Sequence, residues 1–260
     1  MTPLAKPGLL TETERFVFDV AGYLIIADAL TPDEVSACLE AAKRAHAPYP
    51  HDEWRQLGHT YEQEPAFEKL IDHPSVLPKV RALLGDHFIL QSSWCTVVPP
   101  GFKGQRFHQD GSAPYEFRRL ATPTPLVQLR IGYFLTDQSQ ANMGNMSMIP
   151  GSHNSSVPIP ESARMGEGLE SIRQVITGKP GTALMFHQGV YHNGGPNEMD
   201  FHRYIIHMVY APPWLLPSDR KRNDPAFLER TTPLRRALLG EWNRPEEPFG
   251  VGYEKPPFEA

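Results

Sequence analysis

The segment RYIIHMVYAP (residues 203–212) is rich in β-branched and aromatic residues, a composition typical of β-strands. Four earlier segments have the same character, and turns that contain Gly, Pro and Asn separate them. They are FILQSSWCTVV (88–98), LVQLRIGYFLT (126–136), MSMIPG (146–151) and TALMFHQ (182–188). This succession of short strands and turns predicts that residues 88–212 form a jelly-roll or barrel of antiparallel strands.

Residues 13–87 combine helical patterns with one short apolar strand, GYLIIADAL (22–30). The segment TPDEVSACLEAAKRAH (31–46) begins like a helix, with Thr31 as the N-cap and Pro32 in the first turn. Two shorter helices are expected in PAFEKLIDH (65–73) and SVLPKVRALLG (75–85). We therefore expect an α+β, mainly β fold, in which N-terminal helices pack on the β-core.

The 260 residues are expected to form one domain, residues 1–260, because β-barrels and sandwiches often reach this size as a single unit. The 27 prolines favour turns and long ordered loops over a helical bundle. Residues 213–260 are rich in Pro and Arg. We expect this tail to pack over the core or to cover the mouth of a site, without a separate fold.

The overall charge and the distribution of apolar residues exclude two classes of partner. A formal net charge of -5 and a pI near 6.1 provide no basic surface for nucleic acid. No apolar run is long enough to span a membrane, and the first residues lack the features of a signal peptide. Cys38 and Cys95 do not suggest a disulfide framework. A cytoplasmic location is the expectation.

The pentapeptide FHQDG (107–111) contains the first candidate for a metal site. His108 and Asp110 are two positions apart, so in an extended chain both side chains point to the same face. With one more histidine they would form a 2-His-1-carboxylate triad, which leaves one face of Fe(II) open for a co-substrate and oxygen. On its own the motif is weak, because a surface His-x-Asp in a turn is common.

The third ligand must come from a distant strand, and the segment 186–210 is the informative one among eleven histidines. We prefer His192 to His187, because His192 directly precedes a Gly-Gly-Pro turn and lies eleven residues before Arg203. His202 neighbours Arg203 and should point to the opposite face of a strand. His207 shares the parity of Arg203, and the favoured interpretation for it is a satisfied core histidine.

Arg203 is the candidate anchor for a 2-oxo acid co-substrate. An oxidant built from a 2-oxo acid on iron needs a fixed cation for the far carboxylate, and arginine binds carboxylates through two parallel hydrogen bonds. An antiparallel return across the turn 194–197 would bring the Arg203 head within reach of a metal on His192. The alternative is that Arg203 pairs with Asp200 or Glu198 at the surface; the His-x-Asp motif favours the anchor.

At this point the chain resembles the phytanoyl-CoA dioxygenase family of Fe(II)/2-oxoglutarate-dependent oxygenases, over roughly residues 14–212. Four segments carry the resemblance in order: GYLIIADALTPDEVSACLEAA, FHQDG, MSMIPGSH and FHQGVYHNGGPNEMDFHR. The resemblance implies a double-stranded β-helix, a cupin-like jelly-roll, with the N-terminal helices packed on it. It also implies that His108, Asp110 and His192 bind Fe(II), and that Arg203 holds the C5 carboxylate of 2-oxoglutarate.

Other positions are matched less firmly by the family pattern. Gln91 falls where family members often place a polar residue near the co-substrate; the equal alternative is a half-buried strand glutamine. Gly194 departs from the pattern, because many relatives have a serine there whose hydroxyl helps to hold the same carboxylate. Asp110 bears on the type of reaction, since related halogenases lack this carboxylate. Its presence favours hydroxylation or another oxidation that adds no halogen.

The resemblance implies an enzyme that uses 2-oxoglutarate and O2 to oxidise a C–H bond of a small molecule, and that releases succinate and CO2. Gln128 and Arg130 share one face of their predicted strand and are the candidates for substrate contacts. The competing class is a non-catalytic, cupin-like protein that binds a metal or a small ligand.

Overall fold

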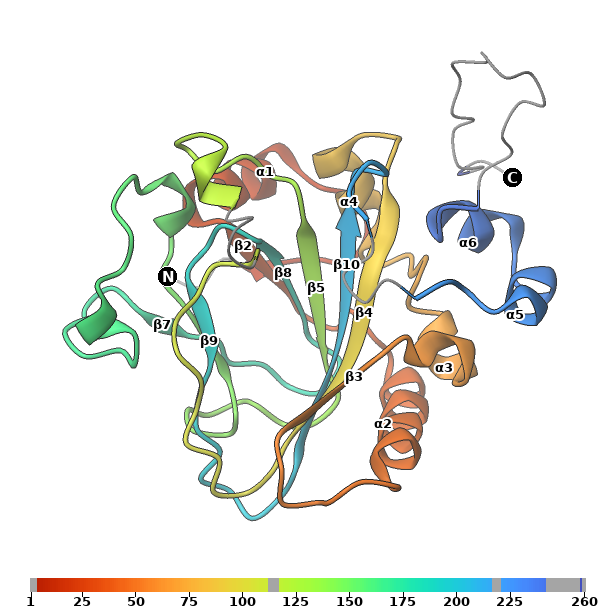
Figure 1. Ribbon diagram of the computed structural model, residues 1–260, viewed down its shortest axis with the longest axis horizontal. Helices are drawn as coiled ribbons and strands as arrows, with labels where there is room; N and C mark the ends of the chain where they lie inside the picture. The colour runs from red at the N-terminus through yellow and green to blue at the C-terminus, as the bar shows by residue number, and fades with distance from the viewer. Residues whose placement is uncertain (1–3, 112–116, 217–220, 242–257, 259–260) are drawn as a thin grey trace.

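Two β-sheets face each other in the computed structural model, which describes residues 4–111, 117–216, 221–241 and 258 (Figure 1). The larger sheet has seven strands in the order β1-β2-β8-β5-β10-β4-β3. Their bounds are β1 Leu4–Ala5, β2 Tyr23–Ile26, β3 Arg55–Gly58, β4 Ile89–Val98, β5 Leu129–Phe134, β8 Ala183–His187 and β10 Arg203–Ala211. The smaller sheet has the order β7-β6-β9, with bounds β6 Met146–Met148, β7 Gln174–Val175 and β9 His192–Gly194.

β10 is the centre of the larger sheet and confirms the strand predicted at residues 203–212. It pairs antiparallel with β4 on one side and with β5 on the other. Alternate residues of β10 face opposite sides. Ile205 contributes to the cluster between the two sheets, whereas Ile206 contributes to the cluster under the helices. The odd-numbered residues, which begin with Arg203, therefore point toward the interior between the sheets.

The helices cover the outer face of the larger sheet. Their bounds are α1 Glu12–Ala21, α2 Pro32–His46, α3 Pro65–Glu68, α4 Leu77–Leu84, α5 Pro225–Arg230 and α6 Pro233–Leu238, with short 3₁₀ turns at Thr60–Glu62, Phe117–Arg119, Ser152–Asn154 and Glu161–Ala163. Figure 1 shows α2 and α3 on the side of this sheet that faces away from β9. Thr31 caps α2 through a reciprocal pair with Glu34, as its sequence predicts. None of these helices combines the length and apolarity needed to cross a membrane.

The expected boundary between a helical part and a β-core at residue 88 is wrong in one respect. β1, β2 and β3 lie before residue 88, and all three belong to the larger sheet. β2 pairs with β8 in antiparallel register, and all four of its residues are buried. Pairing between strands far apart in sequence leaves no local signal, so these strands could not be assigned to the core from their composition.

The described part of the tail packs over the core, which was one of the two expected arrangements. Phe227 of α5 and Leu238 of α6 are buried in the same apolar cluster as the helices α1 to α4. Figure 1 shows α5 and α6 beside α3, on the outer side of the larger sheet. The predicted role of the rest of the tail concerns residues 217–220, 242–257, 259 and 260, which lie outside the described residues.

The expected hairpin across the turn 194–197 is also wrong. β9 pairs with β6 in the smaller sheet, whereas β10 pairs with β4 and β5 in the larger one. The chain therefore crosses from one sheet to the other between His192 and Arg203. The two residues therefore belong to different sheets, and the predicted antiparallel return does not form.

We predict that the buried ion pair between Lys79 and Glu14 is essential for the packing of α1 on α4. Lys79 is fully buried, and its Nζ donates to Glu14 Oε2 and to Leu9 O, each at 2.7 Å. Lys79→Ala removes one partner and leaves a buried carboxylate, so it should lower the free energy of unfolding in urea by about 3–5 kcal/mol.

The matched control is Lys43→Ala in α2, because the Lys43–Glu40 pair is exposed. It should change the urea midpoint far less. Burial raises the pKa of Glu14, but hydrogen bonds from Lys79 and from backbone N–H groups outweigh this and lower it. The stabilisation is therefore present above the pKa of an unfolded glutamate and is lost as the pH falls through the lowered value. Equal effects of the two substitutions would contradict the prediction.

Candidate metal centre

His108 and His192 lie directly opposite each other in an isolated antiparallel bridge. The backbone N–H of each donates to the backbone carbonyl of the other, at 2.9 Å in both directions. Residues paired in this way have side chains on the same face. The two imidazole rings are accordingly close, with centroids 4.4 Å apart.

Both imidazoles are held in one orientation by backbone carbonyls. His108 Nδ1 is 3.0 Å from Arg106 O, and His192 Nδ1 is 2.8 Å from Val190 O. A carbonyl oxygen only accepts, so each Nδ1 carries the hydrogen. Each Nε2 is then left with a free lone pair, which is the arrangement found when a histidine binds a metal.

Asp110 completes the group. Its backbone N–H donates to Gln188 O at 2.9 Å, and its side-chain Oδ1 lies 3.7 Å from His192 Nε2. One ligand atom from each of His108, Asp110 and His192 can be chosen so that all lie within 4.8 Å of one another. The predicted three residues therefore converge on a point that two nitrogens and one oxygen surround.

The surroundings of His192 keep its imidazole neutral. The side chain is 3% exposed and packs against the ring of Phe186, with centroids 4.9 Å apart. Burial lowers the pKa of His192 to about 4, although the Asp110 carboxylate acts in the opposite direction. A neutral imidazole is the form that binds a metal.

Arg130, predicted as a substrate contact, lies against the metal-binding carboxylate candidate. Its Nε is 2.6 Å from Asp110 Oδ2, but neither atom makes an aligned hydrogen bond, so the contact is an ion pair. The guanidinium also stacks over Trp94, 4.7 Å from the ring centroid. Burial lowers the pKa of Arg130, while the Asp110 carboxylate raises it.

Arg203 is buried without a carboxylate partner among the described residues. The residue is 3% exposed; its Nε donates to Gln138 Oε1 at 3.1 Å, and its Nη2 has no hydrogen-bond partner. Asp200 and Glu198, the partners in the alternative interpretation, are exposed at the surface instead. Burial lowers the pKa of Arg203 to about 9, so the group remains charged near neutral pH.

The contacts of Arg203 place it away from the triad along the strands of the smaller sheet. A methyl group on Gly144 would lie 3.2 Å from Arg203 Cβ. Gly144 is two residues before Met146, which pairs with Gly194, and Gly194 is two residues after His192. A strand advances about 3.3 Å per residue, so Arg203 lies along β6 and β9 from the triad.

The cluster fits an iron ion with a bound 2-oxo diacid. Two imidazoles and one carboxylate form the donor set of the 2-His-1-carboxylate triad. The unpartnered Nη2 of Arg203 is a buried donor that a carboxylate would satisfy. The donor set of the triad fits an iron ion, and the unpartnered Arg203 Nη2 fits the far carboxylate of a 2-oxo diacid.

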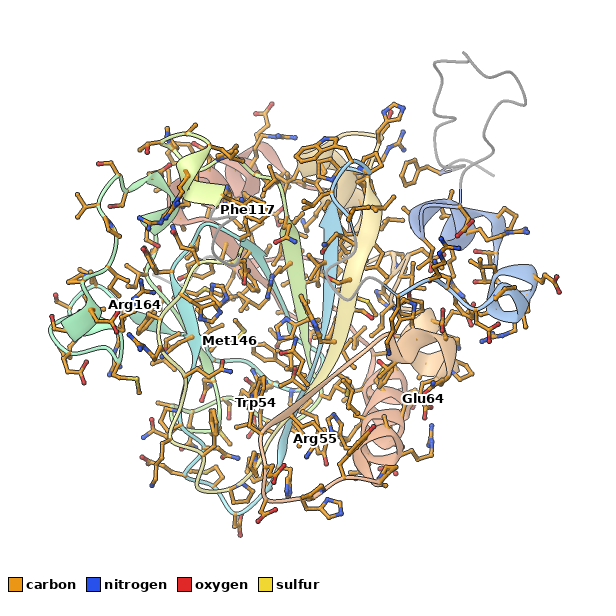
Figure 2. All side chains as sticks on the ribbon, in the orientation of Figure 1. Trp54, Arg55, Glu64, Phe117, Met146 and Arg164 are labelled. Atoms are coloured by element: carbon orange, nitrogen blue, oxygen red, sulfur yellow. The ribbon has the colours of Figure 1, made fainter. Side chains whose placement is uncertain are left out.

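A cavity of about 150 Å³ opens beside His108 and Asp110. Its lining also includes Gln109, Gly111, Phe117, Arg118, Thr124, Arg164, Gly189 and Tyr191. Figure 2 labels Phe117 and Arg164, which come from segments far apart in the sequence. The cavity is the entrance through which a substrate would approach the triad.

The structure does not bring Gln91 to Arg203. Gln91 lies near the start of β4, whereas Val98, at the other end of that strand, is the residue paired with Arg203. The Gln91 side chain is engaged: Nε2 donates to Leu216 O at 2.6 Å, and Oε1 accepts from Gln128 Nε2 at 3.1 Å. Gln128 is therefore tied to Gln91, at the same end of the larger sheet.

The other histidines weighed in the sequence, His187, His202 and His207, lie outside the triad. His187 contacts His153, with ring centroids 4.8 Å apart, and lies outside the triad. His202 is 2.6 Å from His51 O at the surface. His207 has the predicted parity but is not satisfied, since its Nδ1 is buried without a partner. Burial lowers its pKa well below the usual value, and the charges of Arg130 and Arg203 lower it further.

Comparisons with known proteins agree with this geometry. The family model described as phytanoyl-CoA dioxygenase matches residues 18–204. A probable alpha-ketoglutarate-dependent hypophosphite dioxygenase of Stutzerimonas stutzeri is 26% identical over 159 residues, which cover 56% of this chain and 53% of the relative. Dioxygenase trt7 of Aspergillus terreus is 30% identical over 183 residues, which cover 67% and 60%. The chain thus spans little more than half the length of these two relatives.

A solved structure has the same fold. It is HygX from Streptomyces hygroscopicus with nickel and 2-oxoglutarate bound; it aligns with a TM-score of 0.69 at 17% identity, over 80% of this chain and 90% of that one. The likeness confirms the predicted mainly β jelly-roll. Because the family model covers most of the chain, the protein belongs to the phytanoyl-CoA dioxygenase family of Fe(II)/2-oxoglutarate-dependent oxygenases.

Proposed function

We propose that this protein is an Fe(II)- and 2-oxoglutarate-dependent dioxygenase that hydroxylates, or otherwise oxidises, an unactivated C–H bond of a small molecule. The reaction releases succinate and CO2. The observation that carries the proposal is the convergence of His108, Asp110 and His192. The buried Arg203, whose Nη2 has no partner among the described residues, adds the candidate anchor for the co-substrate. The relatives named as dioxygenases, and the neighbour that holds nickel and 2-oxoglutarate, support it.

In this proposal the chain's own residues have separate roles. His108, Asp110 and His192 hold Fe(II), and Arg203 holds the C5 carboxylate of 2-oxoglutarate. Bound iron with 2-oxoglutarate and O2 supplies the oxidising chemistry. The carbonyls of Arg106 and Val190 keep both imidazoles oriented toward the metal. The three residues would leave the remaining coordination positions of the ion for the co-substrate and O2.

Asp110 favours hydroxylation over halogenation. A halide needs a position on iron that no carboxylate occupies, and here the Asp110 side chain lies within the ligand cluster. Its backbone bond to Gln188 and its contact with Arg130 hold it in that place. The presence of a full set of three ligands is therefore the chain's own argument for an oxygen-transfer outcome.

The substrate is proposed to be a small molecule that enters the cavity beside His108. Arg130 remains the proposed substrate contact, because it borders Asp110 and its Nη groups are not used by that contact. Gln128, which is tied to Gln91, is proposed to shape the same end of the site. The net charge of -5 gives no support for a nucleic-acid partner.

We predict that His108→Ala and Asp110→Ala each abolish high-affinity metal binding. Each removes one of three ligands, so the Kd for Mn(II), used in place of Fe(II), should rise by more than the roughly 10- to 100-fold typical of losing a supporting partner. Calorimetric titration measures this. His202→Ala is the control, since His202 contacts His51 O at the surface. Unchanged Mn(II) affinity in both ligand variants would refute the assigned triad.

We predict that Arg203→Ala weakens 2-oxoglutarate and leaves Mn(II) affinity unchanged. Loss of one partner of a buried charge pair costs about 2–5 kcal/mol, which is roughly a 30-fold or larger rise in Kd. Titration of 2-oxoglutarate into the Mn(II)-loaded protein gives the value. If the variant and the wild type bound 2-oxoglutarate equally well, Arg203 would not be the anchor.

We predict that Arg130→Met lowers Mn(II) affinity roughly 10- to 100-fold, because Asp110 loses a supporting partner. Arg235→Met in α6 is a matched control: the Arg235 side chain is 18% exposed, against 17% for Arg130, and it pairs with Asp72 far from the triad. Only the first substitution should change the Mn(II) titration. Equal changes would indicate a general loss of stability.

The catalytic part of the proposal is tested by succinate formation under Fe(II), 2-oxoglutarate and O2. An oxygenase of this kind releases succinate even without its substrate, at a low rate, and addition of a substrate raises that rate. An absence of succinate across a broad panel of small molecules, with intact binding of metal and 2-oxoglutarate, would favour the non-catalytic, cupin-like alternative instead.

A further inference from the structure

Gln138 is a fully buried polar residue to which the proposed function gives no role. It follows β5 and is 0% exposed. Its backbone is fixed from two sides: it forms a pair of bonds with Gly178, and its carbonyl also accepts from Asn145 Nδ2 at 2.9 Å. The side chain therefore extends from a rigid segment, and its direction is not adjustable by loop movement.

Among the described residues, the side-chain amide of Gln138 makes one hydrogen bond, and that bond is to Arg203, the proposed co-substrate anchor. Its Oε1 accepts from Arg203 Nε at 3.1 Å. Arginine only donates, so the atom facing it must be the oxygen, and this fixes the amide orientation. Gln138 Nε2 is buried and has no partner among the described residues.

Two unpartnered donors thus lie side by side. Gln138 Nε2 is bonded to the same carbon as Oε1, so it stands within a few ångströms of the Arg203 guanidinium. Arg203 Nη2 is the second buried donor without a partner. A buried donor without an acceptor is unfavourable, and most such groups in native proteins have a partner. An acceptor with two oxygens, a carboxylate, would satisfy both atoms at once.

We propose that Gln138 is the second anchor of the 2-oxoglutarate C5 carboxylate: Gln138 Nε2 donates to one carboxylate oxygen while Arg203 Nη2 donates to the other. The inference rests on the proposed function and extends it to a residue outside the sequence motifs. Gln138 also orients Arg203, since its Oε1 accepts from Nε and turns Nη2 toward the bound carboxylate.

Gln105 is the competing candidate for this role. Gly194 has no side chain to contribute, and a methyl group at that position would lie 3.0 Å from Gln105 Oε1. Gln105 therefore occupies the space above Gly194. Gln105 is only half-buried, however, and among the described residues the side-chain hydrogen bond of Arg203 goes to Gln138 instead. Full burial and the direct bond to the guanidinium favour Gln138.

The test is calorimetric titration of 2-oxoglutarate into the Mn(II)-loaded full chain. The comparison ligand is 2-oxobutanoate, which has the same metal-binding head but no far carboxylate. Gln138→Met keeps the length of the side chain and removes both polar atoms. It should raise the Kd for 2-oxoglutarate about 10- to 100-fold, the loss expected for a hydrogen bond to a charged group, and leave 2-oxobutanoate within about twofold of the wild type.

The Gln138→Glu variant tests whether Gln138 donates a hydrogen bond to the carboxylate or only orients Arg203. It retains an oxygen for Arg203 Nε, removes the N–H donor and adds a negative charge beside the subsite. We expect it to weaken 2-oxoglutarate more than Gln138→Met does, with 2-oxobutanoate again unaffected. Circular dichroism and Mn(II) affinity confirm that each variant is folded and keeps its metal site.

Three results would overturn the inference while leaving the proposed function in place. The first is a Kd for 2-oxoglutarate within about twofold of the wild type in both variants. The second is equal weakening of the two 2-oxo acids, which indicates a structural role only. The third is a loss of 2-oxoglutarate affinity in Gln105→Ala but in neither Gln138 variant. Failure of the wild type to bind 2-oxoglutarate at all would instead overturn the proposed function, and this inference with it.

Discussion

The reciprocal pair of backbone hydrogen bonds between His108 and His192 is the constraint on which the site depends. It joins a segment that lies between β4 and β5 to the start of β9, more than eighty residues later. Backbone pairing fixes both imidazoles on one face without any contribution from a metal. The carbonyls of Arg106 and Val190 then determine which ring nitrogen is free. A ligand set built in this way is already oriented before an ion arrives.

The interior between the sheets is polar at the places where ligands are expected and apolar elsewhere. The cluster that includes Phe134, Met146 and Ile205 separates the sheets. Arg203 and Gln138 are buried beside it, each with a donor that no described residue satisfies. Such donors reduce the stability of the protein without ligands, and a bound carboxylate removes that cost. The same atoms therefore link folding stability to co-substrate binding.

The sequence predicted those features that depend on short motifs and on local composition. The His-x-Asp pair, the distal His192 and the strand that begins at Arg203 are local patterns, and the structure brings the His-x-Asp pair and His192 together. The sequence could not show that β9 and β10 belong to different sheets, because a turn with Gly-Gly-Pro is also typical of a hairpin. Gln138 went unnoticed, since a lone glutamine has no local signal and its role depends on a contact 65 residues away. Gln91 was matched by position only, and long-range pairing places it at the other end of β4.

Because the chain crosses between the sheets from His192 to Arg203, the apolar core also affects the distance between these two residues. Under the proposed function, the metal end of the co-substrate site would include His192 of β9 in the smaller sheet, and the carboxylate end would include Arg203 of β10 in the larger one. Facing sheets pack about 10 Å apart, and the side chains between them set the actual separation. Phe134, Met146 and Ile205 belong to the apolar cluster between the sheets, and under the proposed function their combined volume would help to set which chain length of diacid spans the gap. Under the proposed function, selectivity for a five-carbon co-substrate would therefore depend on hydrophobic packing.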